Sequence, residues 1–214
     1  LVSQEQAGLL AQRANELELL NQVRGMISSK LEPQELFKAV PETLAKVFGY
    51  DFIDISLLKG EVLEIQHQVG YDPSLPAPQL SIHKGVVGRV ARTGKPLLVQ
   101  DLANHPEYSS PHEKYTGTGV RTISEICVPI LGQGKVVGVL NVESAREILE
   151  ESRLHLLTTV AGYIGIALEQ AELYQALQHS EVRYRELIEN ATDIIYRSDV
   201  AGTFTYTNSV VTRM

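Results

Sequence analysis

Residues 123–131 read Ile-Ser-Glu-Ile-Cys-Val-Pro-Ile-Leu and residues 135–143 read Lys-Val-Val-Gly-Val-Leu-Asn-Val-Glu, with Gly-Gln-Gly between them. Both runs are dense in β-branched and aliphatic residues, and a short glycine-containing connection between two such runs is typical of a β-hairpin. Apolar residues occur on both faces of each run, which predicts two strands in the middle of a sheet. We therefore predict a sheet built from antiparallel hairpins.

The chain ahead of this hairpin supplies further elements of the sheet. Residues 52–58 and 62–69 alternate apolar and polar positions around a Lys-Gly turn and predict a second hairpin. Residues 85–93 predict a short helix, and residues 96–100 another strand. The polar segment 101–119 is longer than an ordinary connection, and loops of this length often cover a site.

Helices flank the predicted sheet at both ends of the chain. Residues 4–29 predict an amphipathic helix with a narrow apolar stripe, and residues 33–47 a second helix that begins at a proline. The stripe consists of Leu10, Leu17, Leu20 and Ile27. From residue 149 a helical pattern continues for about forty residues, and strands are predicted at 194–198 and 203–207.

Composition and charge restrict the partners of the 214-residue chain. Its formal net charge is -7 without a basic stripe, which argues against a nucleic-acid partner. No apolar run reaches the roughly 18 residues that a membrane span requires. The single cysteine, Cys127, excludes a disulfide framework and fits a reducing compartment, so we expect a cytoplasmic location. We also expect the chain to be part of a longer protein.

The order and spacing of four segments strongly resemble GAF domains from about residue 31 to residue 173. These segments are residues 88–96, Asp101, residues 124–130 and residues 134–144. The resemblance implies an α+β fold with a central six-stranded antiparallel sheet. Terminal helices would cover one face, and a ligand pocket with a loop and short helices would lie on the other.

The C-terminal segment resembles the opening of a PAS domain, on residues 183–196 followed by Asp199, Gly202, Tyr206 and Asn208. The implied organisation is an N-terminal signalling helix (1–30), a GAF sensor domain (31–173), a linker helix (174–190) and a truncated PAS start (191–214). This order is typical of bacterial sensor histidine kinases and cyclic-di-nucleotide enzymes. It implies small-molecule sensing and signal relay, without enzymatic activity in this fragment, and a downstream PAS or output domain as a partner.

Seven residues are candidate ligand-binding residues. Strand alternation places Glu125 and Cys127 on one face of their strand, and Asn141 and Glu143 on one face of the next. If these faces line the pocket, as the family resemblance implies, they favour an amino-bearing or cationic small molecule, closed over by Asp101, Tyr108 and Tyr115. In the alternative interpretation the two glutamates pair with Arg121, Arg146 or backbone donors, Cys127 is an apolar core residue, and the two tyrosines only pack the loop against the sheet.

Other chemistries find less support in the sequence. The six histidines lack the spacing of a helical metal site, so neither a metal nor a catalytic residue is expected. Three further functions stay open as alternatives: a non-covalent bilin or cyclic-nucleotide binder, a relative of free methionine-(R)-sulfoxide reductases that lacks their cysteines, and a purely structural dimerisation module. No cofactor can be named.

The terminal helices also predict a parallel homodimer. Beyond residue 169 the helix continues through Leu173 and Leu177, with little sheet left for these leucines to cover. A second copy of the chain would remove them from water.

Overall fold

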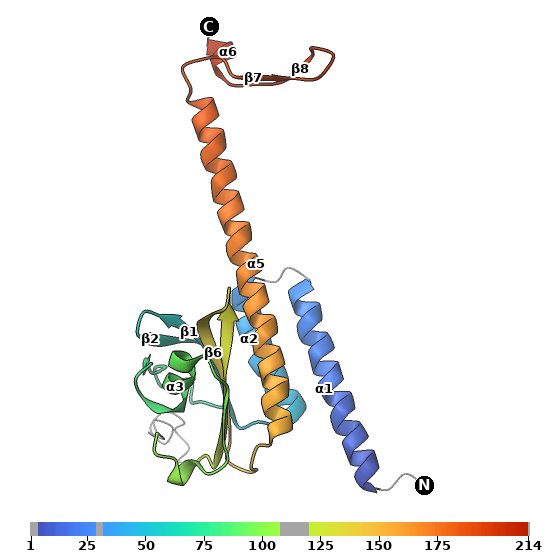
Figure 1. Ribbon diagram of the computed structural model, residues 1–214, viewed down its shortest axis with the longest axis vertical. Coiled ribbons are helices and arrows are strands. Elements are labelled where there is room, and N and C mark those ends of the chain that lie inside the picture. Colours follow the sequence, from blue (N-terminus) through green and yellow to red (C-terminus); the bar gives the residue numbers. More distant parts are fainter. Residues whose placement is uncertain (1–3, 29–31, 108–119, 214) are drawn as a thin grey trace. The chain divides into compact units, whose positions relative to one another are not determined.

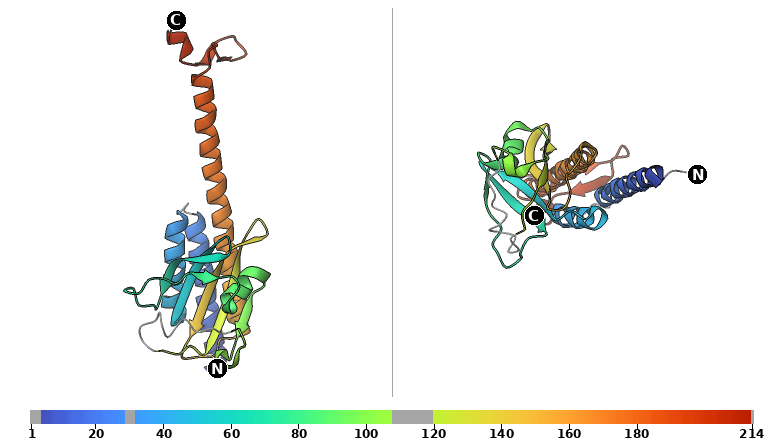
Figure 2. Two further views of the ribbon diagram at one scale, coloured as in Figure 1. Left: turned by 90° about the vertical axis from the view of Figure 1, so that its left-hand side faces the viewer. Right: turned by 90° about the horizontal axis from the view of Figure 1, so that it is seen from below.

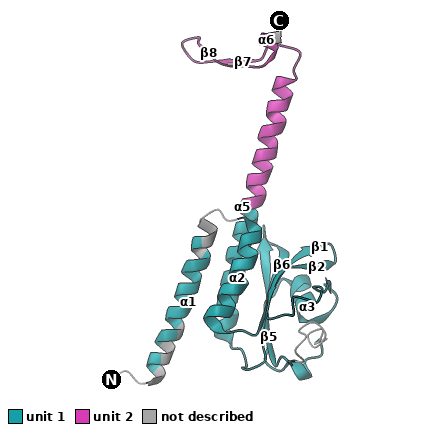
Figure 3. Cartoon of the chain, turned by 180° about the vertical axis from the view of Figure 1, so that it is seen from behind, with its two compact units in different colours: residues 1–169 teal, residues 170–214 magenta. Residues whose placement is uncertain are grey.

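The computed structural model describes residues 4–28, 32–107 and 120–213. The chain divides into two compact units, residues 1–169 and residues 170–214 (Figure 3). Helix α5 (Glu151–Glu189) contributes residues to both units. Each unit is therefore described by itself.

Six strands form one antiparallel sheet in the first unit. They are β1 (Phe52–Lys59), β2 (Val62–Val69), β3 (Leu80–Ser81), β4 (Leu97–Val99), β5 (Ser124–Gly132) and β6 (Lys135–Ser144), in the order β3-β2-β1-β6-β5-β4. Both predicted hairpins are confirmed, and β1 joins them by pairing with β6. The two-residue edge strand β3 was not predicted.

The tight turn of the β5–β6 hairpin depends on backbone conformations that glycine favours. Gln133 has φ 50° and Gly134 has φ 75°, so two consecutive residues adopt left-handed angles. This is the backbone of the turns that match the twist of a two-stranded ribbon. The turn is followed by two paired positions, and the register of β5 against β6 then shifts once, between Ile130 and Leu131.

Helices cover the two faces of the sheet unequally. Helices α1 (Gln4–Ser28), α2 (Pro33–Phe48) and the first part of α5 lie on one side, and α3 (Gly85–Thr93) lies on the other (Figures 1 and 2). Pro33 stands in the first turn of α2, and Gly49, at φ 70°, ends the helix by donating its N–H to the Ala45 carbonyl. Proline at the start and left-handed glycine after the end are the favoured residues at these positions.

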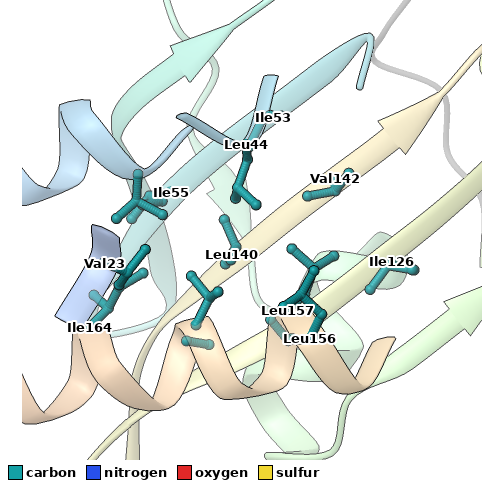
Figure 4. Close-up of a cluster of buried hydrophobic side chains, with 14 of the residues drawn as sticks. Val23, Leu44, Ile53, Ile55, Ile126, Leu140, Val142, Leu156, Leu157 and Ile164 are labelled. Atoms are coloured by element: carbon teal, nitrogen blue, oxygen red, sulfur yellow. The ribbon is translucent and has the colours of Figure 1, made fainter. Parts of the chain in front are cut away.

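The main hydrophobic core lies between the sheet and the three helices. Alternate residues of β1, β5 and β6 point toward α2 and α5 and are fully or almost fully buried (Figure 4). Among them are Ile53, Ile55, Ile126, Leu140 and Val142, which meet Leu44, Leu157 and Ile164. A smaller cluster on the α3 side includes Val86, Val90, Cys127 and Val139.

A close approach brings α5 against the end of β5. A Cβ atom at Gly165 would collide with the carbonyl oxygen of Leu131. The backbone N–H of Gln133 also donates to the carboxylate of Glu169. The β5–β6 turn is therefore joined directly to α5.

The apolar stripe predicted on the first helix is divided between two environments. Leu10 and Leu17 are 60% and 63% exposed, whereas Leu20 packs against the core beside the buried Leu19 and Val23. The side chain of Ile27 lies outside the described residues. The core therefore takes the face of Leu19 and Val23, which are one helical turn apart, and of the predicted stripe only Leu20, among the described side chains, packs against it.

The second unit contains the rest of α5, the hairpin β7 (Tyr196–Ser198) and β8 (Phe204–Thr207), and the short helix α6 (Val210–Arg213). Its best-anchored residue is Asn208, which is 1% exposed. The Asn208 amide accepts from the Ile195 N–H and donates to the Ile188 and Asp193 carbonyls, each at 3.0 Å. One side chain thus joins the end of α5 to the hairpin.

Candidate functional site

The middle of the sheet carries a group of buried polar side chains on the α3 side. Asp54 comes from β1, Glu125 from β5, and Asn141 and Glu143 from β6, and none is more than 3% exposed. Their apolar neighbours Ile53, Ile126 and Val142 point to the opposite face of the sheet, as alternation requires. We call Asp54, Glu125, Asn141 and Glu143 the acidic cluster.

The strand register brings these four residues together. Asp54 lies opposite Asn141, and Glu125 lies opposite Glu143, in the ladders that join β1, β6 and β5. Asn141 Nδ2 donates to Asp54 Oδ2 at 3.2 Å and to Glu143 Oε1 at 3.1 Å. A single amide group therefore bridges two carboxylates.

Asp54 receives two further donors. The Ser56 hydroxyl donates to Asp54 Oδ1 at 3.0 Å, and the Tyr71 hydroxyl lies 3.5 Å from Asp54 Oδ2. Hydrogen bonds to a carboxylate stabilise its charged form. Asp54 is thus the carboxyl group of the cluster with the most described support for a negative charge.

Burial and negative charge shift the acid–base equilibria of the neighbouring groups. Burial, followed by the charges of Glu143 and Asp54, raises the pKa of Glu125 well above its ordinary value. Burial likewise raises the pKa of Cys127, and the three carboxyl groups raise it further. The pKa of Tyr71 is also raised, by burial first and then by Asp54. Cys127 therefore stays a thiol, and a thiol is a poor nucleophile.

The structure unites four of the seven candidates from the sequence and separates another. Glu125, Cys127, Asn141 and Glu143 lie together. Asp101 is exposed and caps the short 3-10 helix η1 (Leu102–Asn104), accepting from the Asn104 backbone and side chain at 3.3 and 2.8 Å. Tyr108 and Tyr115 lie outside the described residues.

Part of the alternative interpretation can also be checked. Arg146, just after β6, pairs with Asp51, just before β1, with Nε 2.8 Å from Oδ1. This ion pair involves neither glutamate of the cluster. Cys127 belongs to the apolar cluster on the α3 side while it also borders the carboxyl groups.

Sequence reasoning missed Asp54, Ser56 and Tyr71. Asp54 and Ser56 stand at alternate positions among Ile53, Ile55 and Leu57, so a polar face inside an apolar strand was a readable signal. Tyr71 follows β2 in a proline-rich stretch, where no local pattern indicates that its side chain joins the cluster. Its place depends on the packing of Phe52, whose ring lies 5.3 Å from that of Tyr71.

The architecture and the family comparison agree. Residues 32–168 match the GAF domain family. The chain belongs to the GAF domain family. This match spans α2, the whole sheet and the part of α5 that packs on the sheet, and it confirms the resemblance in the sequence.

Curated relatives of this GAF domain include an enzyme, a sensor and a regulatory protein. A probable 3′,5′-cyclic phosphodiesterase of Caenorhabditis elegans is 30% identical over 52% of this chain and 15% of its own length. A methyl sulfide methyltransferase-associated sensor of Methanosarcina acetivorans is 28% identical over 62% of this chain and 13% of its own length. A Nif-specific regulatory protein of Herbaspirillum seropedicae is 26% identical over 84% of this chain and 34% of its own length. The chain thus spans about a third or less of these relatives.

Solved structures of low sequence identity share the fold. A GAF domain from a Coxiella burnetii phosphoenolpyruvate-protein phosphotransferase has a TM-score of 0.67 at 18% identity, covering 76% of this chain and 98% of that one. A free methionine-R-sulfoxide reductase of Neisseria meningitidis, solved with its substrate, has a TM-score of 0.66 at 20% identity, covering 74% and 91%. These similarities establish the fold of the GAF domain.

The acidic cluster suits a positively charged partner that can donate hydrogen bonds. Buried carboxylates are stabilised by an opposite charge with good hydrogen-bond geometry. The described residues include no group of three or more His, Cys, Asp or Glu side chains arranged to hold a metal ion. They also include no helix with the length and apolar content of a membrane span.

Proposed function

We propose that this GAF domain senses a small molecule bearing an ammonium group, bound at the acidic cluster, and relays its presence through α5. The observation that carries the proposal is a pair of buried carboxyl groups, Asp54 and Glu143, bridged by the Asn141 amide, with the buried Glu125 directly opposite Glu143. An ammonium group is a compact cation with several N–H donors, so it can satisfy more than one carboxylate at once.

The relay would use the contacts between the sheet and α5. β5 carries Glu125 at one end and, at Leu131, touches the backbone of α5 at Gly165. A shift of β5 on ligand binding would therefore act on a helix that continues without interruption to Glu189. Rigid elements with tight contacts transmit small displacements well.

We further propose that the relay operates in a parallel homodimer joined by the terminal helices. On α5, Ile166, Leu173, Leu177, Tyr184 and Leu187 are all between 48% and 67% exposed. Their spacings of seven, four, seven and three residues are those of a coiled-coil seam. Leu10 and Leu17 on α1, also seven residues apart, offer a second exposed stripe.

The wider setting that we propose is a cytoplasmic sensor protein, of the histidine kinase type, in which residues 191–214 begin a PAS domain. The names of the Methanosarcina and Herbaspirillum relatives, a sensor and a regulatory protein, support a signalling role. The domain itself would lack enzymatic activity, because its only cysteine is buried and its thiol pKa is raised. Incubation with methionine sulfoxide and a thiol reductant should therefore yield no methionine.

Thermal unfolding of the chain with free amino acids and methionine sulfoxide tests the ligand class. Each compound is compared with its N-acetyl form, which lacks the ammonium charge. We expect at least one free compound to raise the unfolding temperature, its acetylated form to have no effect, and Asp54→Asn to remove the shift. The matched control Glu61→Gln changes an exposed carboxylate and should keep the shift. Equal stabilisation by the acetylated forms would refute the proposed ligand class.

A further inference from the structure

The three carboxyl groups of the acidic cluster differ in their surroundings. Asp54 accepts hydrogen bonds from Ser56 and Asn141, and Glu143 accepts one from Asn141. Among the residues that the structure describes, no hydrogen bond reaches the carboxyl group of Glu125. A buried carboxylate without donors is much more costly than one that accepts hydrogen bonds.

Within the described part of the chain, the titratable groups that interact with Glu125 are all acids, which carry either no charge or a negative charge. Glu143 lies directly opposite on β6, Asp54 lies on β1, Cys127 follows on β5, and Tyr71 comes from the segment after β2. Two carboxylates at directly opposite strand positions repel each other. A proton on Glu125 relieves both this repulsion and the cost of a buried charge.

Asn141 supplies an independent sign that the site is built for a further hydrogen-bond donor. Its Nδ2 is committed to Asp54 and Glu143, so its Oδ1 is left as an acceptor within the cluster. Oδ1 is buried, and within the described part of the chain it has no hydrogen-bond partner. Native structures rarely leave such an atom unsatisfied unless a ligand or water completes it.

We infer that the ligand exchanges with a proton: Glu125 is a neutral acid in the ligand-free domain and releases its proton to solvent when an ammonium group binds Asp54, Glu143 and Asn141 Oδ1. The inference rests on the proposed function and adds a dependence on pH to it. The positive charge of the ammonium group then offsets the negative charge that Glu125 acquires, so the site gains the ammonium group and loses the Glu125 proton. No covalent bond other than the O–H bond of Glu125 breaks.

The sign of the pH effect follows from linkage. The pKa of Glu125 is raised in the folded state, so its stabilising proton is present at low pH and is lost as pH rises through the folded-state value. Without ligand, the domain should lose stability with rising pH above the ordinary glutamate pKa. Ligand affinity should rise over the same range, by up to about tenfold per pH unit for one released proton.

The first test needs no ligand. Unfolding temperatures of the whole chain are measured from about pH 5 to about pH 9 for the parent, Glu125→Gln and Glu61→Gln. We expect the unfolding temperature of the parent to fall with rising pH relative to that of Glu125→Gln. The unfolding temperature of the control Glu61→Gln should follow that of the parent. ¹³C NMR titration of labelled glutamate carboxyls, assigned by Glu125→Gln, should show the Glu125 signal still protonated at neutral pH. Parallel curves for parent and Glu125→Gln, or a carboxylate signal at neutral pH, would overturn the inference.

The second test uses methylammonium chloride as the probe, with sodium chloride and tetramethylammonium chloride at equal ionic strength as controls. Methylammonium should raise the unfolding temperature of the parent by an amount that increases with pH. For Glu125→Gln the rise should not depend on pH. Stabilisation of the parent that is independent of pH would refute proton exchange while leaving the proposed ligand class intact. Absence of any methylammonium effect in both proteins would refute the ligand class, and the exchange with it.

Discussion

Replacing Leu173 and Leu177 by glutamate should separate the proposed homodimer into monomers. The two side chains are 65% and 57% exposed in one chain, so a partner helix could bury about three-fifths of the surface of each. Full burial of a leucine is worth roughly 1.5 to 3 kcal/mol, which gives about 1 to 2 kcal/mol for each of these leucines in a dimer. Across both copies the pair contributes about 4 to 8 kcal/mol, equivalent to roughly three to six orders of magnitude in the dissociation constant.

Sedimentation equilibrium and light scattering on the parent and on the Leu173→Glu/Leu177→Glu chain measure this effect. Gln175→Glu is the control, because it adds one glutamate between the two leucines, on another face of the helix. We expect a dimeric parent, a dimeric control and a monomeric double variant whose sheet still unfolds cooperatively. A monomeric parent, or a dimer that tolerates both glutamates, would refute dimerisation through this stripe.

Three further changes test other parts of the structure. Gly165→Ala should destabilise the first unit by about 1 to 3 kcal/mol in denaturant unfolding, because the methyl group collides with the Leu131 carbonyl; Gly162→Ala, with open space around it, should not. Glu143→Gln should leave the unfolding temperature nearly unchanged and abolish stabilisation by an ammonium ligand, and a fall of several degrees would instead indicate a structural pair. Asn208→Ala should cost about 1 to 3 kcal/mol locally, seen as faster amide exchange at Ile195; unchanged exchange there would contradict its anchoring role.

Local sequence patterns were sufficient for most elements of the sheet and its helices. Alternation predicted β1 and β2, and runs rich in β-branched residues predicted β5 and β6. Helical periodicity with proline and glycine signals predicted α2 and α3. The strand β3 was not predicted, because its two residues, Leu80 and Ser81, are too few to show an alternating pattern. They are a strand only because Val62 and Leu63 offer them an edge to pair with.

The acidic cluster shows the same limit at the level of the site. Glu125, Asn141 and Glu143 could be placed on common faces by alternation within one hairpin. Asp54 joins them only because β1 pairs with β6, which depends on the order of strands rather than on any local pattern. In the same way, helical periodicity found apolar residues on α1 but could not tell which side the core would cover.

The position of Cys127 makes the chain well suited to site-specific labelling. It is the only cysteine in the sequence, its side chain is 0% exposed, and its thiol pKa is raised. Maleimides and methanethiosulfonate spin labels react with exposed thiolates, so the native residue should remain unmodified in the folded domain. A cysteine introduced at Gln175 can therefore carry the only probe, and spin–spin distances between copies can be recorded without first removing a native thiol.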